Sequence, residues 1–346
     1  MRIVSLDYLR AILAVGVMIA HYSLWTRGAG NAADSSTRFE LYRVPMFYLL
    51  SGLTIYYFYA EKLVLDMPSL KKFFLKRIKR LAPLFYLATI ITVVLFRMKP
   101  ELITIITNFT GLFAVYEWDN VIVYGGWAIG NELVFYVAFP ILLYVYRRSI
   151  PSFAVVMFIL FAIFIYFSFF ALSNENSFIA QWKTYINPLN QLFVFGCGFA
   201  VGAIFKNIKV KPIISIGLMI LAFLIFMLYP AIGDRIELVT GWARVAFTVA
   251  CLLIIIPVFK LSIKLPEMFH NIFSKVAQAS YSIYLLHPIV YRIFIKLADI
   301  LKGKGIHIPI QLLLLTSGLI TILISYQVYV HFELLFMKDK KQFKPA

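Results

Sequence analysis

Long apolar segments recur along the whole chain and restrict the folds that it can adopt. Most of them approach the length of about 20 residues that an α-helix needs to cross a bilayer. Hydrophobic residues make up 62% of the chain and charged residues only 14%. This composition excludes an ordinary soluble enzyme and predicts an all-α, polytopic bundle of transmembrane helices. The segments are 4–25, 41–60, 81–96, 101–116, 124–146, 152–171, 189–205, 212–229, 241–259, 276–298 and 309–331.

The charged residues also bear on the class of protein. The net charge of +17 could indicate nucleic-acid binding, but lysine and arginine lie in short loops between apolar segments. Membrane proteins place such loops in the cytoplasm, so we expect no nucleic-acid partner. Cys197 and Cys251 both lie inside apolar segments. We therefore expect no disulfide framework and no metal site.

The basic loops predict the topology of the chain. The densest basic run, from Lys71 to Arg80, is placed in the cytoplasm together with the N-terminus. The later basic clusters also become cytoplasmic if segment 101–116 does not cross the membrane. We therefore expect about ten spans, with both termini in the cytoplasm. Segment 101–116 is short and follows Pro100, as an interfacial or re-entrant piece would.

The domain organisation is simple. We expect a single membrane domain over residues 1–346, in which 337–346 form a short cytoplasmic tail. The first apolar segment contains charged residues, and no small-residue cleavage site follows it. It therefore reads as a retained first span rather than as a signal peptide.

The first apolar segment carries a polar stripe. In a helix, the eleven residues from Arg10 to His21 return to within about 20° of the same direction and rise roughly 16 Å. Asp7 lies within about 60° of that face. An arginine or aspartate at the centre of a span costs about 3 kcal/mol on insertion scales, so such a stripe must face protein or water and indicates a functional site.

His21 is the leading candidate for a general base. Its unperturbed pKa lies near neutral pH, and burial favours the neutral form that accepts a proton. The alternative is a histidine of the packed interior that bonds to a neighbouring helix. Arg10 and Asp7 on the same face favour the functional interpretation, in which Arg10 either fixes Asp7 or contacts the substrate.

Five stretches in order resemble the acyltransferase 3 family of membrane proteins. None of them is specific alone, but together they extend over nearly the whole chain. They are Leu6–Ala11 with His21, Pro45–Gly52, Arg77–Pro83, Trp127–Tyr136 and Ser280–His287.

The resemblance implies an O-acyltransferase of the bacterial inner membrane. Such enzymes move an acyl group, usually acetyl, from cytoplasmic acyl-CoA to a hydroxyl of a cell-surface or exported polysaccharide. Acetyl-CoA would be a co-substrate, and no permanently bound cofactor is expected. The hydrolase-like extracytoplasmic domain frequent in the family has no counterpart in this sequence. Transfer would then be completed by the membrane domain or with a separate glycan-assembly protein.

The matched motifs suggest site residues. Arg77 and Arg80, three residues apart, can present both guanidinium groups to the phosphates of the donor together with Arg10. Alternatively, Arg77 and Arg80 belong to the general excess of basic residues at the cytoplasmic ends of spans, or they contact lipid headgroups. We also place Tyr281 and His287 at the donor site, although tyrosines at this spacing in a span often serve packing.

Glu132 and the Ser51–Gly52 pair have their own alternatives. Glu132 lies about eight residues into a span and needs a polar partner there. It could orient the imidazole of His21, as a carboxylate does in hydrolytic triads, or it could serve helix packing. Ser51 and Gly52 allow close approach of helices, so we interpret them as packing residues.

A transporter or flippase is the competing function. The same intramembrane charges could line a path for an anionic or lipid-linked glycan, with no bond made. Paired, interrupted spans would favour transport, but Pro140, Pro188 and Pro288 show no pairing. We therefore prefer the acyltransferase.

Overall fold

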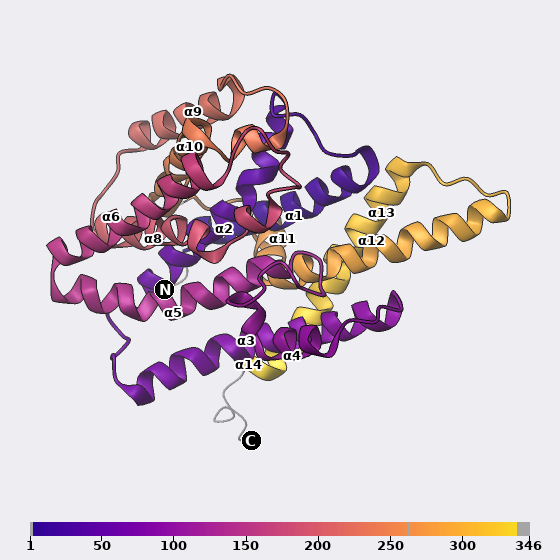
Figure 1. Ribbon diagram of the computed structural model, residues 1–346, viewed down its shortest axis with the longest axis horizontal. Coiled ribbons are helices and arrows are strands. Elements are labelled where there is room, and N and C mark those ends of the chain that lie inside the picture. Colours follow the sequence, from indigo (N-terminus) through magenta and orange to yellow (C-terminus); the bar gives the residue numbers. More distant parts are fainter. Residues whose placement is uncertain (1–2, 262, 338–346) are drawn as a thin grey trace.

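The computed structural model describes residues 3–261 and 263–337. Most of these residues are helical, and none of them lies in a β-strand. The predicted all-α, polytopic helical bundle is confirmed (Figure 1). The helices are α1 (Val4–Arg27), α2 (Ser35–Tyr59), α3 (Met67–Leu95), α4 (Leu102–Thr110), η1 (Leu112–Ala114), α5 (Gly126–Arg148), α6 (Ile150–Tyr166), η2 (Phe167–Ala171), α7 (Trp182–Tyr185), α8 (Pro188–Phe205), α9 (Pro212–Leu228), η3 (Arg235–Leu238), α10 (Gly241–Lys260), α11 (Glu267–Gln278), α12 (Ser280–Gly303), α13 (Ile310–Val328), η4 (Tyr329–Glu333) and α14 (Leu334–Met337).

Helix length and composition mark the candidate spans. Seven helical stretches of the described chain are long and apolar enough to cross a membrane. They comprise α1, α3, α5, α6 with η2, α7 with α8, α10, and α13 with η4 and α14. α9 is also apolar, but it is shorter. A total of about ten spans, with both termini in the cytoplasm, stays a prediction.

Segment 101–116 does not form a spanning helix, as its sequence predicts. α4 contains nine residues, which corresponds to a length of about 14 Å. The hydrocarbon core of a bilayer is about 30 Å thick. Gly111 ends the helix with a φ of 78°, a left-handed conformation that glycine adopts at little cost.

The predicted loop from Lys71 to Arg80 is wrong, because α3 already begins at Met67. The carboxylate of Asp66 caps this helix by accepting a hydrogen bond of 2.8 Å from the backbone N–H of Ser69. Phe73 and Leu81 are buried while the lysines of this stretch are exposed. The first turns of α3 are therefore an amphipathic helix with one buried face, and a search for uniformly apolar segments misses such a helix.

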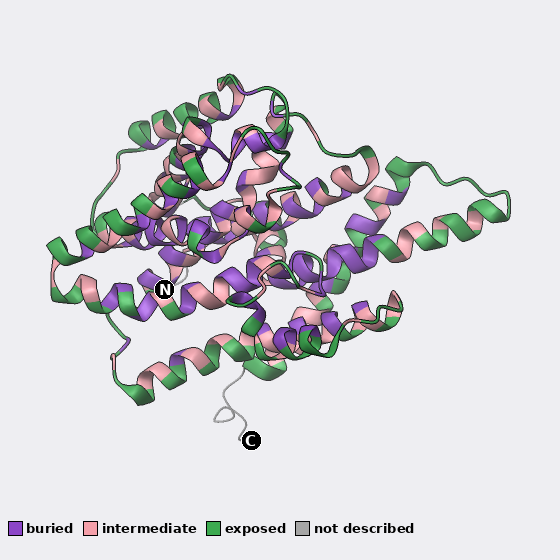
Figure 2. Cartoon of the chain, in the orientation of Figure 1, coloured by how far each residue is buried: buried purple, intermediate pink, exposed green. Residues whose placement is uncertain are grey.

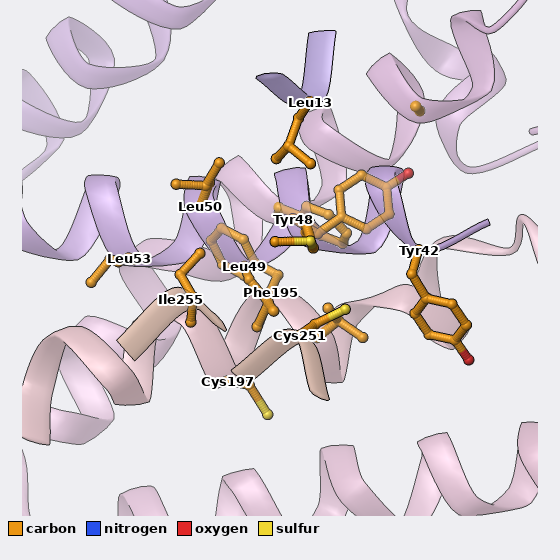
Figure 3. Close-up of a cluster of buried hydrophobic side chains, with 14 of the residues drawn as sticks. Leu13, Tyr42, Tyr48, Leu49, Leu50, Leu53, Phe195, Cys197, Cys251 and Ile255 are labelled. Atoms are coloured by element: carbon orange, nitrogen blue, oxygen red, sulfur yellow. The ribbon is translucent and has the colours of Figure 1, made fainter. Parts of the chain in front are cut away.

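The core is formed around the contact of α2 with α8. A Cβ atom on Gly52 would lie 2.1 Å from the carbonyl oxygen of Phe195, and one on Gly198 equally close to that of Leu49. The two backbones touch at both glycines, which confirms the packing role predicted for Gly52. Side chains from α2, α8 and α10 fill the space around this contact (Figure 3).

The outside of the bundle is apolar on several helices. Large hydrophobic side chains are exposed along α6, α9 and α13, among them Phe158, Ile216 and Leu315. Buried residues gather on α2, α8 and the first half of α12 (Figure 2). Apolar outer faces around a packed interior fit contact with lipid. Of the predicted tail 337–346, all but Met337 lies outside the described residues.

Candidate active site

A pocket between α1, α2, α3, α5 and α12 contains three of the predicted arginines. Arg10, Arg77 and Arg80 line it together with Glu132. We call it the arginine pocket. Its other polar lining residues are Ser51, Thr54, Tyr48, Tyr136, Ser280, Tyr281 and Tyr284.

Arg10 is held by its own helix. Its guanidinium lies 2.9 Å from a carboxylate oxygen of Asp7, three residues earlier in α1. The Asp7 side chain is 10% exposed and that of Arg10 is 22% exposed. This salt bridge is one of the two arrangements considered for Arg10, and it restricts the direction in which the Arg10 side chain enters the pocket.

Arg77 is enclosed by aromatic rings. Its guanidinium carbon lies 4.8 Å from the ring centroid of Tyr59, 5.3 Å from that of Phe73 and 5.4 Å from that of Tyr136. Such contacts stabilise a cation within a low-dielectric environment. The Nε of Arg77 is buried and has no hydrogen-bond partner in the described part of the chain. A buried donor without a partner is uncommon in folded proteins, so this N–H marks Arg77 as a candidate binding residue.

Arg80 is flanked by two carboxylates. Glu132 and Glu333 both lie within electrostatic reach of its guanidinium. The Ser51 hydroxyl donates a hydrogen bond of 3.4 Å to Glu132, and the Ser282 hydroxyl donates one to Glu333. These hydrogen bonds hold the two carboxylates in place beside Arg80. Ser51 therefore lines the site and does more than the predicted packing.

His21 forms a pair with His287 further along the bundle. The Nδ1 of His21 lies 2.7 Å from the Nε2 of His287. The two rings are nearly parallel, with an interplanar angle of 17° and centroids 5.0 Å apart. The Nδ1 of His287 lies 2.9 Å from the carbonyl oxygen of Ile283, one turn earlier in α12.

These hydrogen bonds determine the tautomers of a neutral pair. The carbonyl of Ile283 can only accept, so the Nδ1 of His287 carries a proton. The Nε2 of His287 then accepts, which places the proton of His21 on its Nδ1. The lone pair that these two hydrogen bonds do not use is on the Nε2 of His21. His287 thus fixes the tautomer and the ring orientation of His21.

Aromatic side chains surround the histidine pair. The Trp25 ring stacks on His21 at 5.4 Å and on His287 at 5.9 Å between centroids. The Tyr124 ring meets His21 edge to face at 5.2 Å. These rings fix the plane of the imidazoles and exclude bulk water from their faces.

The arginine pocket and the histidine pair follow one another along two helices. In α1, Arg10 precedes His21, and in α12 the pocket residues Tyr281 and Tyr284 precede His287. The Tyr284 ring lies 6.2 Å from His287, and its hydroxyl donates to the carbonyl of the residue before α5 at 2.9 Å. Tyr284 therefore lies between the arginine pocket and the histidine pair.

A family model described as an acyltransferase domain, that of the acyltransferase 3 family, matches residues 3–330. The chain belongs to the acyltransferase 3 family. It is therefore a multi-pass membrane acyltransferase. Membership favours bond-making over the transporter as the function of the intramembrane charges. No curated protein and no solved structure matches the chain significantly.

The structure divides the residues predicted for this acyltransferase between two places. Arg10, Arg77, Arg80, Glu132 and Tyr281 come together in the arginine pocket, with Asp7 behind Arg10. His287, predicted at the donor site, lies beside His21 instead of lining that pocket. Glu132, predicted to orient an imidazole, lies among arginines. The roles of these residues stay predictions.

Three charged residues near the site were missed in the sequence. Arg43 of α2 lies against α1, where a Cβ on Gly16 would come within 2.8 Å of its Nε. Arg235 pairs with Glu40 at 2.9 Å and lies within electrostatic reach of His21. Arg43 had a usable signal, since it is an arginine inside the second apolar segment. No sequence pattern marks Glu40 and Arg235, because each lies in a polar stretch between two apolar segments.

Proposed function

We propose that this acyltransferase moves an acetyl group from cytoplasmic acetyl-CoA to a hydroxyl of a cell-surface or exported polysaccharide, across a bacterial inner membrane. The proposal depends on one observation: along α1 and α12 the arginine pocket comes first, Tyr284 lies next to it, and the histidine pair follows. A donor entering from the predicted cytoplasmic end meets the arginines first and the base last. The acceptor then approaches from the other end.

The arginine pocket suits the phosphates of coenzyme A. Arg77 retains a buried donor at Nε, and Arg80 and Arg10 line the same space. Guanidinium groups bind phosphate oxygens through two parallel hydrogen bonds, which gives both affinity and orientation. The long pantetheine arm would pass Tyr284 and bring the thioester to His21.

The histidine pair supplies the proton chemistry. The Nε2 of His21 takes the proton of the acceptor hydroxyl while the hydroxyl oxygen attacks the thioester carbonyl. The C–S bond then breaks, and the thiolate of coenzyme A receives that proton from His21. Throughout, the Nε2 of His287 accepts a hydrogen bond from the Nδ1–H of His21 and thereby keeps the lone pair on the reacting nitrogen. His287 is a positioning residue in this scheme.

An acyl-histidine intermediate is the second route through the same residues. The Nε2 of His21 would itself attack the thioester and later pass the acetyl group to the hydroxyl. This route predicts ping-pong kinetics, whereas direct transfer requires donor and acceptor to be bound together. Initial rates measured over a grid of both substrates separate the two.

Acetyl transfer by the purified protein in lipid nanodiscs tests the proposal. Radiolabelled acetyl-CoA is supplied with polysaccharide from the producing cells, and the label in the glycan is counted. In cells, removal of the protein should eliminate an O-acetyl signal from the NMR spectrum of the surface glycan. A pure, folded protein that neither binds acetyl-CoA nor labels glycan would contradict the proposal.

A further inference from the structure

A second hollow lies beyond the histidine pair, at the C-terminal ends of α1 and α3 and beside the middle of α12. We call it the aromatic hollow. It is lined by Trp25, Phe96, Tyr291, Arg292, Ile295 and Lys296. The rings of Trp25 and Tyr291 are 4.8 Å apart between centroids, and Trp25 also stacks on both histidines. Trp25 therefore both lines this hollow and contacts the histidine pair.

The order of residues places the aromatic hollow opposite the arginine pocket. In α1 the pocket residue Arg10 comes first, then His21, then Trp25 of the hollow. α12 repeats this order, since Tyr281 lines the pocket and Tyr291 lines the hollow on either side of His287. The pocket and the hollow thus lie on opposite sides of the histidine pair along both helices. A two-substrate transfer needs such a second approach, because the donor occupies the first.

Two cations without acidic partners lie on one wall of the hollow. The guanidinium carbon of Arg292 is 4.9 Å from the ring centroid of Phe96, and the ammonium of Lys296 is 5.2 Å from it. Both side chains are exposed. Within residues 3–261 and 263–337 neither forms a salt bridge, and Asp299 one turn further along α12 does not pair with Lys296. The hollow therefore offers two positive charges to a ligand.

We propose that the aromatic hollow is the acceptor subsite, an inference that rests on the proposed function. Its ligand is a carbohydrate that carries negative charge, as carboxylate or phosphate. The flat faces of Trp25 and Tyr291 provide apolar surfaces for sugar rings. Arg292 and Lys296 bind the anionic group. One sugar hydroxyl then points past Trp25 to His21.

Binding of two matched oligosaccharides tests the proposal without requiring turnover. The full-length protein in phosphatidylcholine nanodiscs is titrated with a galacturonic acid hexamer and with the neutral galactose hexamer of the same linkage. We expect the anionic hexamer to bind at least about 10-fold more tightly. The double variant Arg292→Gln with Lys296→Gln should lose this preference, whereas Lys302→Gln with Lys304→Gln, near the end of the same helix, should keep it.

A charge-retaining variant, a second lipid and a donor-binding measurement complete the test. Arg292→Lys with Lys296→Arg retains both charges and should retain the preference, which tests the proposal even if the neutral variant does not fold. Equal binding of the two hexamers by the native protein, or a preference that survives charge removal, overturns the proposal. A preference abolished by replacing phosphatidylcholine with phosphatidylglycerol also overturns it, because the hollow would then bind a lipid headgroup. Acetyl-CoA binding, measured on the same samples, fails only if the proposed function fails.

Discussion

The Nδ1 of His21 lies 2.7 Å from the Nε2 of His287, although 266 positions separate the two residues in the chain. The bond joins the first helix to α12 and leaves a lone pair on the Nε2 of His21. The proposed base and the residue proposed to orient it thus come from distant parts of the sequence. Two of the predictions below separate their roles.

His21→Gln keeps the size and the hydrogen-bonding capacity of the side chain but removes its basicity. We expect acetyl transfer to fall by about 10²–10⁴-fold, with little change in acetyl-CoA binding. Turnover and donor binding are measured on the same purified sample, with thermal unfolding as the control for folding. Transfer at a near-native rate by the folded variant would end the assignment of His21 as the base.

His287 should affect the rate through His21 alone. His287→Leu removes the acceptor for the Nδ1 proton of His21, and we expect kcat to fall by about 10²-fold or more while the KM for acetyl-CoA is unchanged. His287→Gln can still accept that proton through its amide oxygen and should recover part of the rate. If both variants were equally slow, His287 would have only a packing role.

The sequence was sufficient to predict the class of fold and the polar face of α1. The apolar segments locate the helices, and the spacing of Arg10 and His21 places both on one side of α1. The apolar segments did not locate the start of α3, because its first turns are charged. That helix begins at Met67 because of its N-terminal cap and a buried stripe of apolar residues.

The partners of the site residues could not be predicted in the same way. The carboxylate of Glu132 could have met a histidine or an arginine, and only the packing of α5 against α3 and α2 places it near Arg80. Likewise, nothing local to His287 indicates whether it faces the donor or His21. A single sequence contains the residue types of a site, whereas their pairing depends on long-range contacts.

Arg77→Ala with Arg80→Ala should raise the KM for acetyl-CoA by at least about 10-fold and change kcat less, because phosphate contacts are made equally in the ground and transition states. Lys76→Ala with Lys79→Ala is the matched control. These lysines have the same spacing on α3, but they are exposed and do not line the pocket. A double arginine variant with an unchanged KM would remove both residues from the donor site.

Reporter fusions after residues 118 and 148 test the topology. α4 is too short to cross the bilayer, and α5 is long enough to do so. The two reporters should therefore lie on opposite sides, with the second in the cytoplasm. Reporters on the same side would show that α5 does not cross the membrane, and a first reporter in the cytoplasm with the second outside would show that 101–116 crosses it.

The contact of α2 with α8 should tolerate no added side chain at its glycines. A Cβ on Gly52 would lie 2.1 Å from a backbone oxygen, so Gly52→Ala must move one helix away from the other. We expect a loss of about 1–3 kcal/mol in the free energy of unfolding, read as a lower thermal midpoint in detergent. Gly217→Ala is the control, because a Cβ there meets no atom within 4 Å, and alanine favours the helix. If both variants had the native midpoint, the close approach of the two backbones would not contribute to stability.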